Sequence, residues 1–171
     1  MQAETVDCDL VVIGGGPCGS TAATLARQAG LSVVLVERDA FPRFHIGESL
    51  LPAGNVFLRR SGVWPKVESA GFIRKAGARF CSADASADKR IEFGRGFVRG
   101  LDSTFQVSRA KFDHILLEHA RSEGVVIKQG WKANRLVQTS EDVTAWLVSG
   151  VGGQETIRAR WCQVSPTSAY P

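Results

Sequence analysis

The fold is decided by residues 10–19, which read LVVIGGGPCG. Residues 9–13 form a short, β-branched run of the kind found in strands that are buried on both faces of a parallel sheet. The run ends at glycines, and residues 17–29 are mostly small helix formers followed by Gly30 at a helix C-cap position. Residues 32–37 then read as a second buried strand. Strand, glycine turn, helix and strand within about thirty residues predict a βαβ unit.

The glycines of this unit match the G-x-G-x-x-G pattern of dinucleotide sites, in which they allow a tight turn, close approach to a pyrophosphate, and helix-to-strand packing. The residues expected around the phosphates at the helix N-terminus are Gly14, Gly16, Pro17, Cys18 and Gly19. Glu37 ends the second strand, where its carboxylate can accept hydrogen bonds from ribose hydroxyls. A purely structural glycine turn is the alternative. The motif alone does not separate NAD from FAD.

Turn signals and periodicity predict the other elements. They are a polar loop at 41–51, helices at 52–61 and 109–122, irregular strands of a smaller sheet within 72–100, a third parallel strand at 125–128, and a β-meander at 131–138, 143–149 and 155–161. Strands that alternate with helices indicate an α/β fold with a parallel sheet.

Composition is that of an ordinary globular domain, with 44% hydrophobic and 22% charged residues among 171. One domain is therefore expected. The net charge of +4 is spread along the chain, so nucleic-acid binding is not indicated. The four cysteines have no zinc-ligand spacing, which favours free thiols and no metal. No signal peptide or membrane span is apparent, and a cytoplasmic protein is expected.

The segment around residues 37–52 resembles flavin-dependent halogenases and related single-component flavoprotein monooxygenases. It runs ERDAFPRFHIGESLLP, and the resemblance extends over about residues 7–161. It implies an FAD-binding domain of the glutathione-reductase type, Rossmann-like with a parallel sheet and a β-meander, with FAD as the cofactor. The residues that the resemblance places at the nucleotide or near the flavin ring are Arg38, His45, Gly47, Glu48, Ser49 and Arg109.

Lys75 matches the lysine that follows the Gly-Glu-Ser helix in flavin-dependent halogenases. In that family reduced FAD, oxygen and halide yield an electrophilic halogen, and the lysine passes it to an aromatic substrate. The resemblance therefore implies a catalytic role for Lys75 and an aromatic partner of phenol, pyrrole or indole type, in some cases tethered to a carrier protein. It also implies a separate flavin reductase. A solvated surface lysine is the alternative.

The chain departs from the family pattern near its C-terminus. Residues 162–166 read CQVSP where an Asp-Ala-Ser-Gly-like turn is expected, and the later Gly-Asp and Trp-x-Trp-x-Ile-Pro segments are missing. An incomplete domain that exposes apolar surface is therefore expected over residues 1–171, without most of the substrate domain. The open alternatives to a halogenase are an aromatic hydroxylase, a geranylgeranyl-reductase-like flavoprotein, and a non-catalytic nucleotide-binding remnant.

Overall fold

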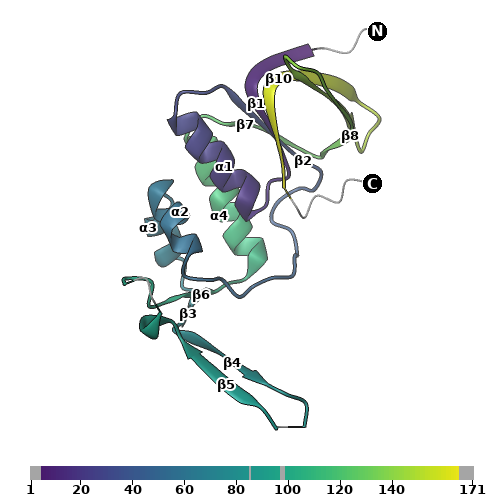
Figure 1. Ribbon diagram of the computed structural model, residues 1–171. Helices are drawn as coiled ribbons and strands as arrows, with labels where there is room; N and C mark the ends of the chain where they lie inside the picture. The colour runs from purple at the N-terminus through teal and green to yellow at the C-terminus, as the bar shows by residue number, and fades with distance from the viewer. Residues whose placement is uncertain (1–4, 85, 97–98, 166–171) are drawn as a thin grey trace. The chain divides into compact units, whose positions relative to one another are not determined.

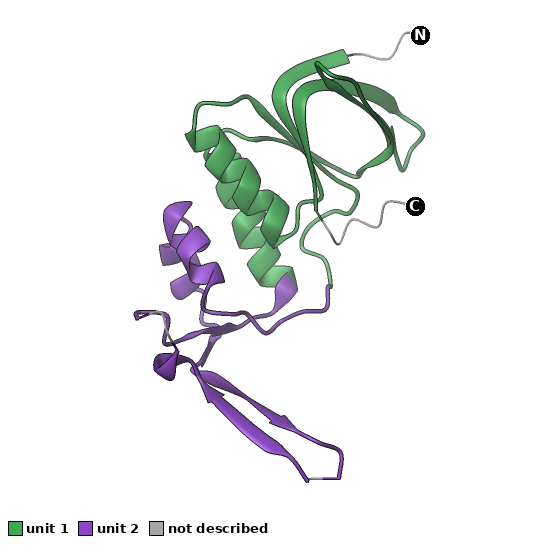
Figure 2. Ribbon diagram, in the orientation of Figure 1, with its two compact units in different colours: residues 1–44, 110–171 green, residues 45–109 purple. Residues whose placement is uncertain are grey.

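The computed structural model describes residues 5–84, 86–96 and 99–165 (Figure 1). The chain forms two compact units where composition predicts one domain: unit 1 comprises residues 1–44 and 110–171, and unit 2 comprises residues 45–109 (Figure 2). The elements in chain order are β1 (Thr5–Ile13), α1 (Pro17–Gln28), β2 (Val33–Glu37), α2 (Gly54–Arg60), α3 (Trp64–Glu68), β3 (Ile73–Lys75), β4 (Gly77–Cys81), β5 (Asp88–Glu92), the 3-10 helix η1 (Phe93–Arg95), β6 (Thr104–Gln106), α4 (Arg109–Ser122), β7 (Val126–Gln129), β8 (Trp131–Gln138), β9 (Val143–Ser149) and β10 (Gln154–Val164).

Unit 1 is built on a six-stranded sheet with the order β7-β2-β1-β10-β9-β8 (Figure 1). Its first four strands run parallel, and β9 and β8 continue the sheet in antiparallel fashion. The helix α1 makes the crossover from β1 to β2, as a parallel pair requires. The α/β class, the βαβ unit, the third parallel strand and the meander predicted from the sequence are all confirmed.

The parallel strands are buried on both faces because different layers cover the two sides of the sheet. Val12 and Leu35 point into a core shared with α1 and α4, through residues such as Ala23 and Leu117. The neighbouring side chains along β1 and β2 point into a second core against the meander strands; this second core contains Val11, Ile13, Val34, Val36, Ala133, Ala145, Leu147, Ile157 and Ala159. The period of two along each strand thus separates the two layers.

Strands β1 and β10 are both longer than the sequence predicts. They pair in parallel from Thr5 opposite Thr156 to Ile13 opposite Val164, and the backbone N–H of Ser165 donates to the carbonyl of Ile13 at 2.8 Å. This long ladder extends both strands beyond the continuous apolar run from which the sequence analysis predicts them. Residues 162–164, where the chain departs from the family pattern, therefore continue the central sheet; Pro166 lies outside the described residues.

Unit 2 consists of the helices α2 and α3 and two small antiparallel sheets, β3 with β6 and β4 with β5. Val63 and Val67 are fully buried, and Phe105 of β6 lies 5.6 Å from Trp64 and 6.4 Å from Phe72 between ring centroids. The predicted helix at 52–61 and the irregular strands within 72–100 are confirmed. The sequence analysis missed α3 and β6, which are too short to show periodicity.

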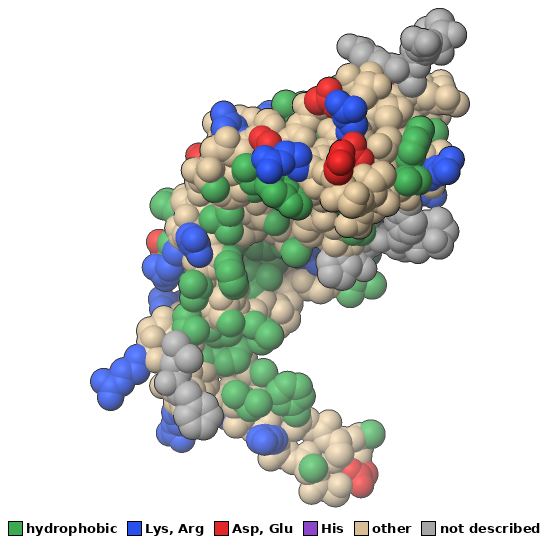
Figure 3. All heavy atoms as spheres, turned by 45° about the horizontal axis from the view of Figure 1, so that its top comes forward, with side chains coloured by type: hydrophobic (Ala, Val, Ile, Leu, Met, Phe, Trp, Pro, Cys, Tyr) green, Lys and Arg blue, Asp and Glu red, His purple; other side chains and the backbone are tan. Residues whose placement is uncertain are grey.

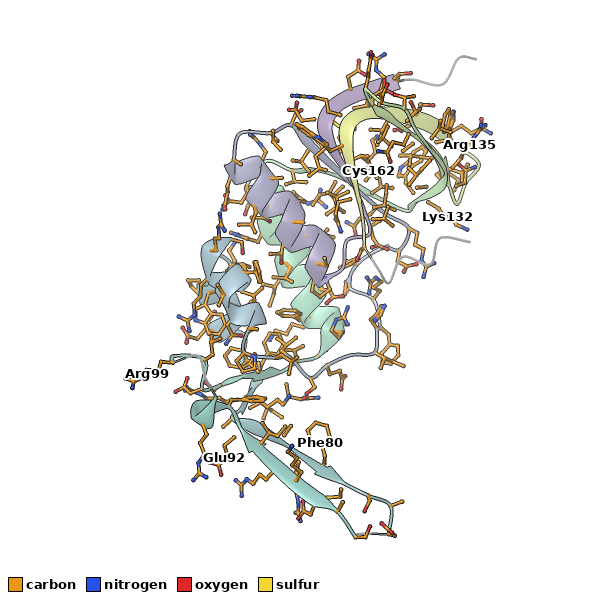
Figure 4. The ribbon with its side chains drawn as sticks, viewed as in Figure 1. Phe80, Glu92, Arg99, Lys132, Arg135 and Cys162 are labelled. Carbon is orange, nitrogen blue, oxygen red and sulfur yellow. The ribbon has the colours of Figure 1, made fainter. Side chains whose placement is uncertain are left out.

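Several hydrophobic side chains are open to solvent, and Figure 3 shows many such side chains on one face of the molecule. In unit 2, Ile46 is 79% exposed, Ile73 is 74% exposed and Leu51 is 65% exposed. Phe80 on β4 (Figure 4) is 61% exposed on the same hairpin face as Ile91. These side chains leave apolar surface of unit 2 open to solvent.

Among the described residues, no helix combines the length and the apolar character needed to cross a membrane. The same residues contain no group of three His, Cys, Asp or Glu side chains placed to hold a metal ion. Cys8, Cys18, Cys81 and Cys162 are free thiols, as the sequence analysis predicts.

Candidate cofactor site

The glycine turn lies between β1 and α1, and each of its glycines has a distinct geometric task. Gly14 has a φ of 102°, a left-handed conformation that favours glycine, and its N–H donates to the carbonyl of Val36 at 2.8 Å. A Cβ on Gly19 would lie 1.9 Å from the carbonyl oxygen of Gly14, so α1 approaches the turn as closely as a glycine allows. A Cβ on Gly16 would meet only Nη2 of Arg43, at 3.7 Å, which leaves this face of the turn accessible to a ligand.

The start of α1 suits an anionic ligand. Pro17 occupies the first turn, and that turn contains no acidic residue. Cys18 is exposed beside the turn, and Nε2 of Gln163 at the end of β10 donates to its Sγ at 3.9 Å. The N–H groups and dipole of a helix N-terminus favour phosphate binding, and contact of these residues with the phosphates stays a prediction.

Glu37 is buried at the end of β2, with an exposed fraction of 4%. Its Oε2 accepts a hydrogen bond from the N–H of Gly15 at 2.6 Å, and its Oε1 accepts one from the N–H of Asp39 at 2.9 Å. An ionised carboxylate has about four lone-pair positions, so acceptor capacity is left for a ribose hydroxyl. Arg38, the next predicted site residue, has a side chain that is 53% exposed and pairs with Asp39 at 3.7 Å.

The Gly-Glu-Ser loop belongs to unit 2 and is joined to β6 by an isolated β-bridge. The N–H of Val107 donates to the carbonyl of Glu48 at 2.8 Å, the N–H of Leu50 donates to the carbonyl of Phe105 at 3.1 Å, and Ser49 forms an antiparallel bridge with Gln106. The segment predicted as a loop is therefore held by backbone hydrogen bonds.

His45 and Gly47 lie at the start of this segment. Nδ1 of the half-buried His45 is 2.8 Å from the carbonyl oxygen of Ile46, and Gly47 has a φ of 102°. Arg109 is only 8% exposed, so it is not a solvated surface arginine. Its Nη1 donates to the carbonyl oxygens of Ile46 at 2.8 Å and Gly47 at 3.4 Å. Arg109 therefore fixes the backbone from which the Gly-Glu-Ser residues continue.

Lys75 ends β3 and reaches the Gly-Glu-Ser loop within unit 2. Its Nζ donates to Oγ of Ser49 at 2.6 Å and to the carbonyl of Leu50 at 3.1 Å, and it lies 5.1 Å from the ring centroid of Phe93. The residue is half-buried. Lys75 is thus not a freely solvated surface lysine.

Two residues of unit 1 next to the glycine turn were not predicted as site residues. Arg43 lies between Glu37 and Asp113, and Asp113 on α4 is fully buried. Asp113 faces inward on a helix whose neighbouring inward positions are apolar, among them Phe112 and Leu116. A carboxylate on the apolar face of an amphipathic helix is the sequence signal that could have identified it.

The parallel sheet, the glycine turn, the helix N-terminus and the buried carboxylate define a nucleotide-binding α/β domain of the flavoprotein type. The chain belongs to the family described as FAD binding domain, which it matches over residues 7–162. FAD is therefore its cofactor. The open face at Gly16 and the spare acceptor capacity of Glu37 fit the diphosphate and adenosine ribose of this molecule.

Comparisons with known proteins agree with this assignment. A 1H-pyrrole-2-carbonyl peptidyl-carrier-protein chlorinase from Pseudomonas fluorescens is 41% identical over 140 residues, and the match covers 72% of this chain and 31% of the relative. Tryptophan 2-halogenase from Chondromyces crocatus is 40% identical over 151 residues, covering 87% of this chain and 28% of the relative. The structure of a myxobacterial chondrochloren halogenase aligns with a TM-score of 0.84 at 32% identity, over 94% of this chain and 37% of the other. The chain thus spans well under half the length of these proteins.

Proposed function

We propose that this chain forms the cofactor-binding part of a flavin-dependent halogenase that acts on an aromatic ring. Support comes from relatives that are named as halogenases and are 41% and 40% identical to this chain over the matched residues. The observation that carries the proposal is the position of Lys75, whose amine is fixed on the Gly-Glu-Ser loop by Ser49 and Leu50.

In the proposed reaction a halide ion loses two electrons and replaces a hydrogen of the aromatic ring. When bound, FAD would supply the redox chemistry: overall, FADH2, oxygen, the halide ion, one proton and the aromatic C–H would become FAD, the aryl halide and two water molecules. The protein contributes position. The hydrogen bonds from Lys75 to Ser49 and Leu50, together with the Phe93 ring, hold the amine in one place, where it can present the electrophilic halogen to the substrate.

The proposed substrate is a phenol, pyrrole or indole. Tethering to a carrier protein is part of the proposal because two relatives are named as a chlorinase and a brominase of pyrrole-carbonyl groups on a peptidyl-carrier protein. A separate flavin reductase is the proposed source of reduced FAD.

The test is product analysis on the full-length gene product with a flavin reductase, chloride or bromide, and a panel of phenols, pyrroles and indoles. We expect Lys75→Ala to bind FAD and consume oxygen but to lose halogenated product at least a hundredfold. Lys89→Ala, which changes an exposed lysine on β5, is the matched control and should keep the wild-type rate. Ser49→Ala removes one of the contacts of the Lys75 amine and should give an intermediate loss.

Two results would contradict the proposal. Halogenation at the wild-type rate by Lys75→Ala would remove this lysine from the reaction. Hydroxylated product from the wild-type protein, with no halogenated product at any halide concentration, would make it an aromatic monooxygenase instead.

A further inference from the structure

Arg43 of unit 1 is surrounded by three carboxylates. Its Nη1 donates to Oδ2 of Asp113 at 3.3 Å, its Nη2 lies 3.8 Å from Oε2 of Glu37, and its Nε lies 3.6 Å from Oδ2 of Asp39. The guanidinium also stacks on the ring of Phe41, with 4.6 Å from Cζ to the centroid. The exposed fraction of the side chain alone is 13% for Arg43, 5% for Glu37 and 0% for Asp113.

The charges of this cluster matter for an anionic cofactor. Glu37 and Asp113 place two buried negative charges beside the glycine turn, and Arg43 is the positive charge that the structure shows against both of them. Without Arg43, the two carboxylates would repel each other and the diphosphate of FAD. Arg43 therefore neutralises the charge of Glu37, so that this carboxylate can bind ribose hydroxyls close to a site for phosphates.

The geometry also connects Arg43 to the cofactor-binding residues themselves. The Oε2 atom that faces Arg43 is the one that accepts the hydrogen bond from Gly15 in the glycine turn. The Nη2 atom is the nearest neighbour of the position that a Cβ of Gly16 would occupy, at 3.7 Å. The Nε atom of Arg43 is buried and has no hydrogen-bond partner among the described residues. The guanidinium therefore has one donor that the fold does not satisfy.

We propose that Arg43 is a positioning residue of the FAD site: its ion pair with Asp113 holds the Glu37 carboxylate and the glycine turn in the arrangement that receives the adenosine half of the cofactor. The arginine acts through Glu37. This inference requires only the FAD cofactor of the family, so it stands or falls separately from the halogenation proposed above.

The test compares FAD with FMN, which lacks the adenosine half, as ligands of the full chain in flavin fluorescence titrations. We expect Arg43→Met to lower the affinity for FAD at least tenfold and to leave the affinity for FMN within twofold. Arg43→Lys keeps the charge but loses the planar fork, and it should recover part of the FAD affinity. An equal loss for both ligands, or no loss for either, would overturn the proposal.

The double variant Arg43→Met/Asp113→Leu separates positioning from folding. Replacing Arg43 and Asp113 together removes both members of this buried ion pair and the repulsion between Asp113 and Glu37, so the double variant should unfold at a higher temperature than Arg43→Met alone. We expect the affinity of this double variant for FAD to remain at least tenfold below that of the wild-type chain. Recovery of wild-type FAD affinity together with wild-type stability would show that the pair is only a structural brace.

A further comparison tests whether Arg43 acts through Glu37. Adding Glu37→Gln to Arg43→Met should lower FAD affinity little more than the stronger of the two single changes, because both remove the same interaction. If the loss of FAD affinity in the double variant equals the product of the losses in the two single variants, Arg43 acts on FAD independently of Glu37, which contradicts the proposed role.

Discussion

Alanine substitutions at Gly19 and Gly16 should separate the two tasks of the glycine turn. A Cβ on Gly19 would lie 1.9 Å from the carbonyl oxygen of Gly14, whereas real Cβ atoms keep at least 3.0 Å, so α1 and the turn must move apart by about 1.1 Å. A Cβ on Gly16 would lie 3.7 Å from its nearest neighbour, an ordinary contact. Gly19→Ala therefore strains the fold. Gly16→Ala leaves the fold unchanged but places a methyl group in the space that the ligand would occupy.

The magnitudes follow from these distances. Overpacking of this kind costs about 3 kcal/mol when backbone atoms must move. Alanine recovers about 1 kcal/mol through its higher helix propensity, because Gly19 lies within α1. The net loss of about 2 kcal/mol corresponds to a fall in Tm of about 4–8 °C for a chain of this size. For Gly16→Ala the loss of the N-cap glycine is worth less than about 1 kcal/mol, but FAD affinity should fall at least tenfold.

Thermal unfolding followed by circular dichroism and FAD fluorescence titration measure the two effects. Gly54→Ala is the matched control, since a Cβ at this helical position meets nothing within 4 Å and should leave stability equal or slightly higher. The reasoning is refuted if Gly19→Ala unfolds within 2 °C (on the order of 0.5 kcal/mol) of the wild-type chain. It is equally refuted if Gly16→Ala binds FAD with wild-type affinity.

Two further predictions concern stability. Asn55 is buried on α2, where its Nδ2 donates to the carbonyl of Ser103 and its Oδ1 accepts a hydrogen bond from Thr104, so Asn55→Ala should lower the free energy of unfolding by about 1–3 kcal/mol in urea titrations. Asn55→Asp keeps the acceptor for Thr104 but buries a carboxylate whose second oxygen would face the carbonyl of Ser103, so it should cost at least as much as Asn55→Ala. A smaller loss of stability for Asn55→Asp would contradict this. Burial raises the pKa of Cys8 and of Cys162 to about 11 from an ordinary 9.0, so the folded chain retains thiol protons that the unfolded chain loses. Their contribution to stability is complete below pH 9 and is lost as the pH rises toward 11. The free energy of unfolding in urea should therefore differ less between pH 8 and pH 10.5 for Cys8→Ala/Cys162→Ala than for the wild-type chain. An unchanged difference would argue against these thiols as the cause.

The sequence by itself determined the elements whose signals are local. The glycine motif, the β-branched runs and the helical spacing predicted β1, α1 and β2 in order, and the helix at 109–122 has the bounds that the structure shows. These signals are readable because backbone sterics and side-chain periodicity act over a few residues. The α/β class follows from the same local patterns.

Only the tertiary structure decided which distant residues meet. The parallel pairing of β1 with β10 joins residues about 150 positions apart and makes both strands longer than the local pattern predicts. The contact of Lys75 with Ser49 depends on the pairing of both segments with β6, and the contact of Arg43 with Asp113 depends on how α4 packs within unit 1. No periodicity in the sequence encodes such pairs. The residue types of the cofactor site could therefore be predicted from the sequence, while the residues that orient them are specified by packing between elements far apart in the chain.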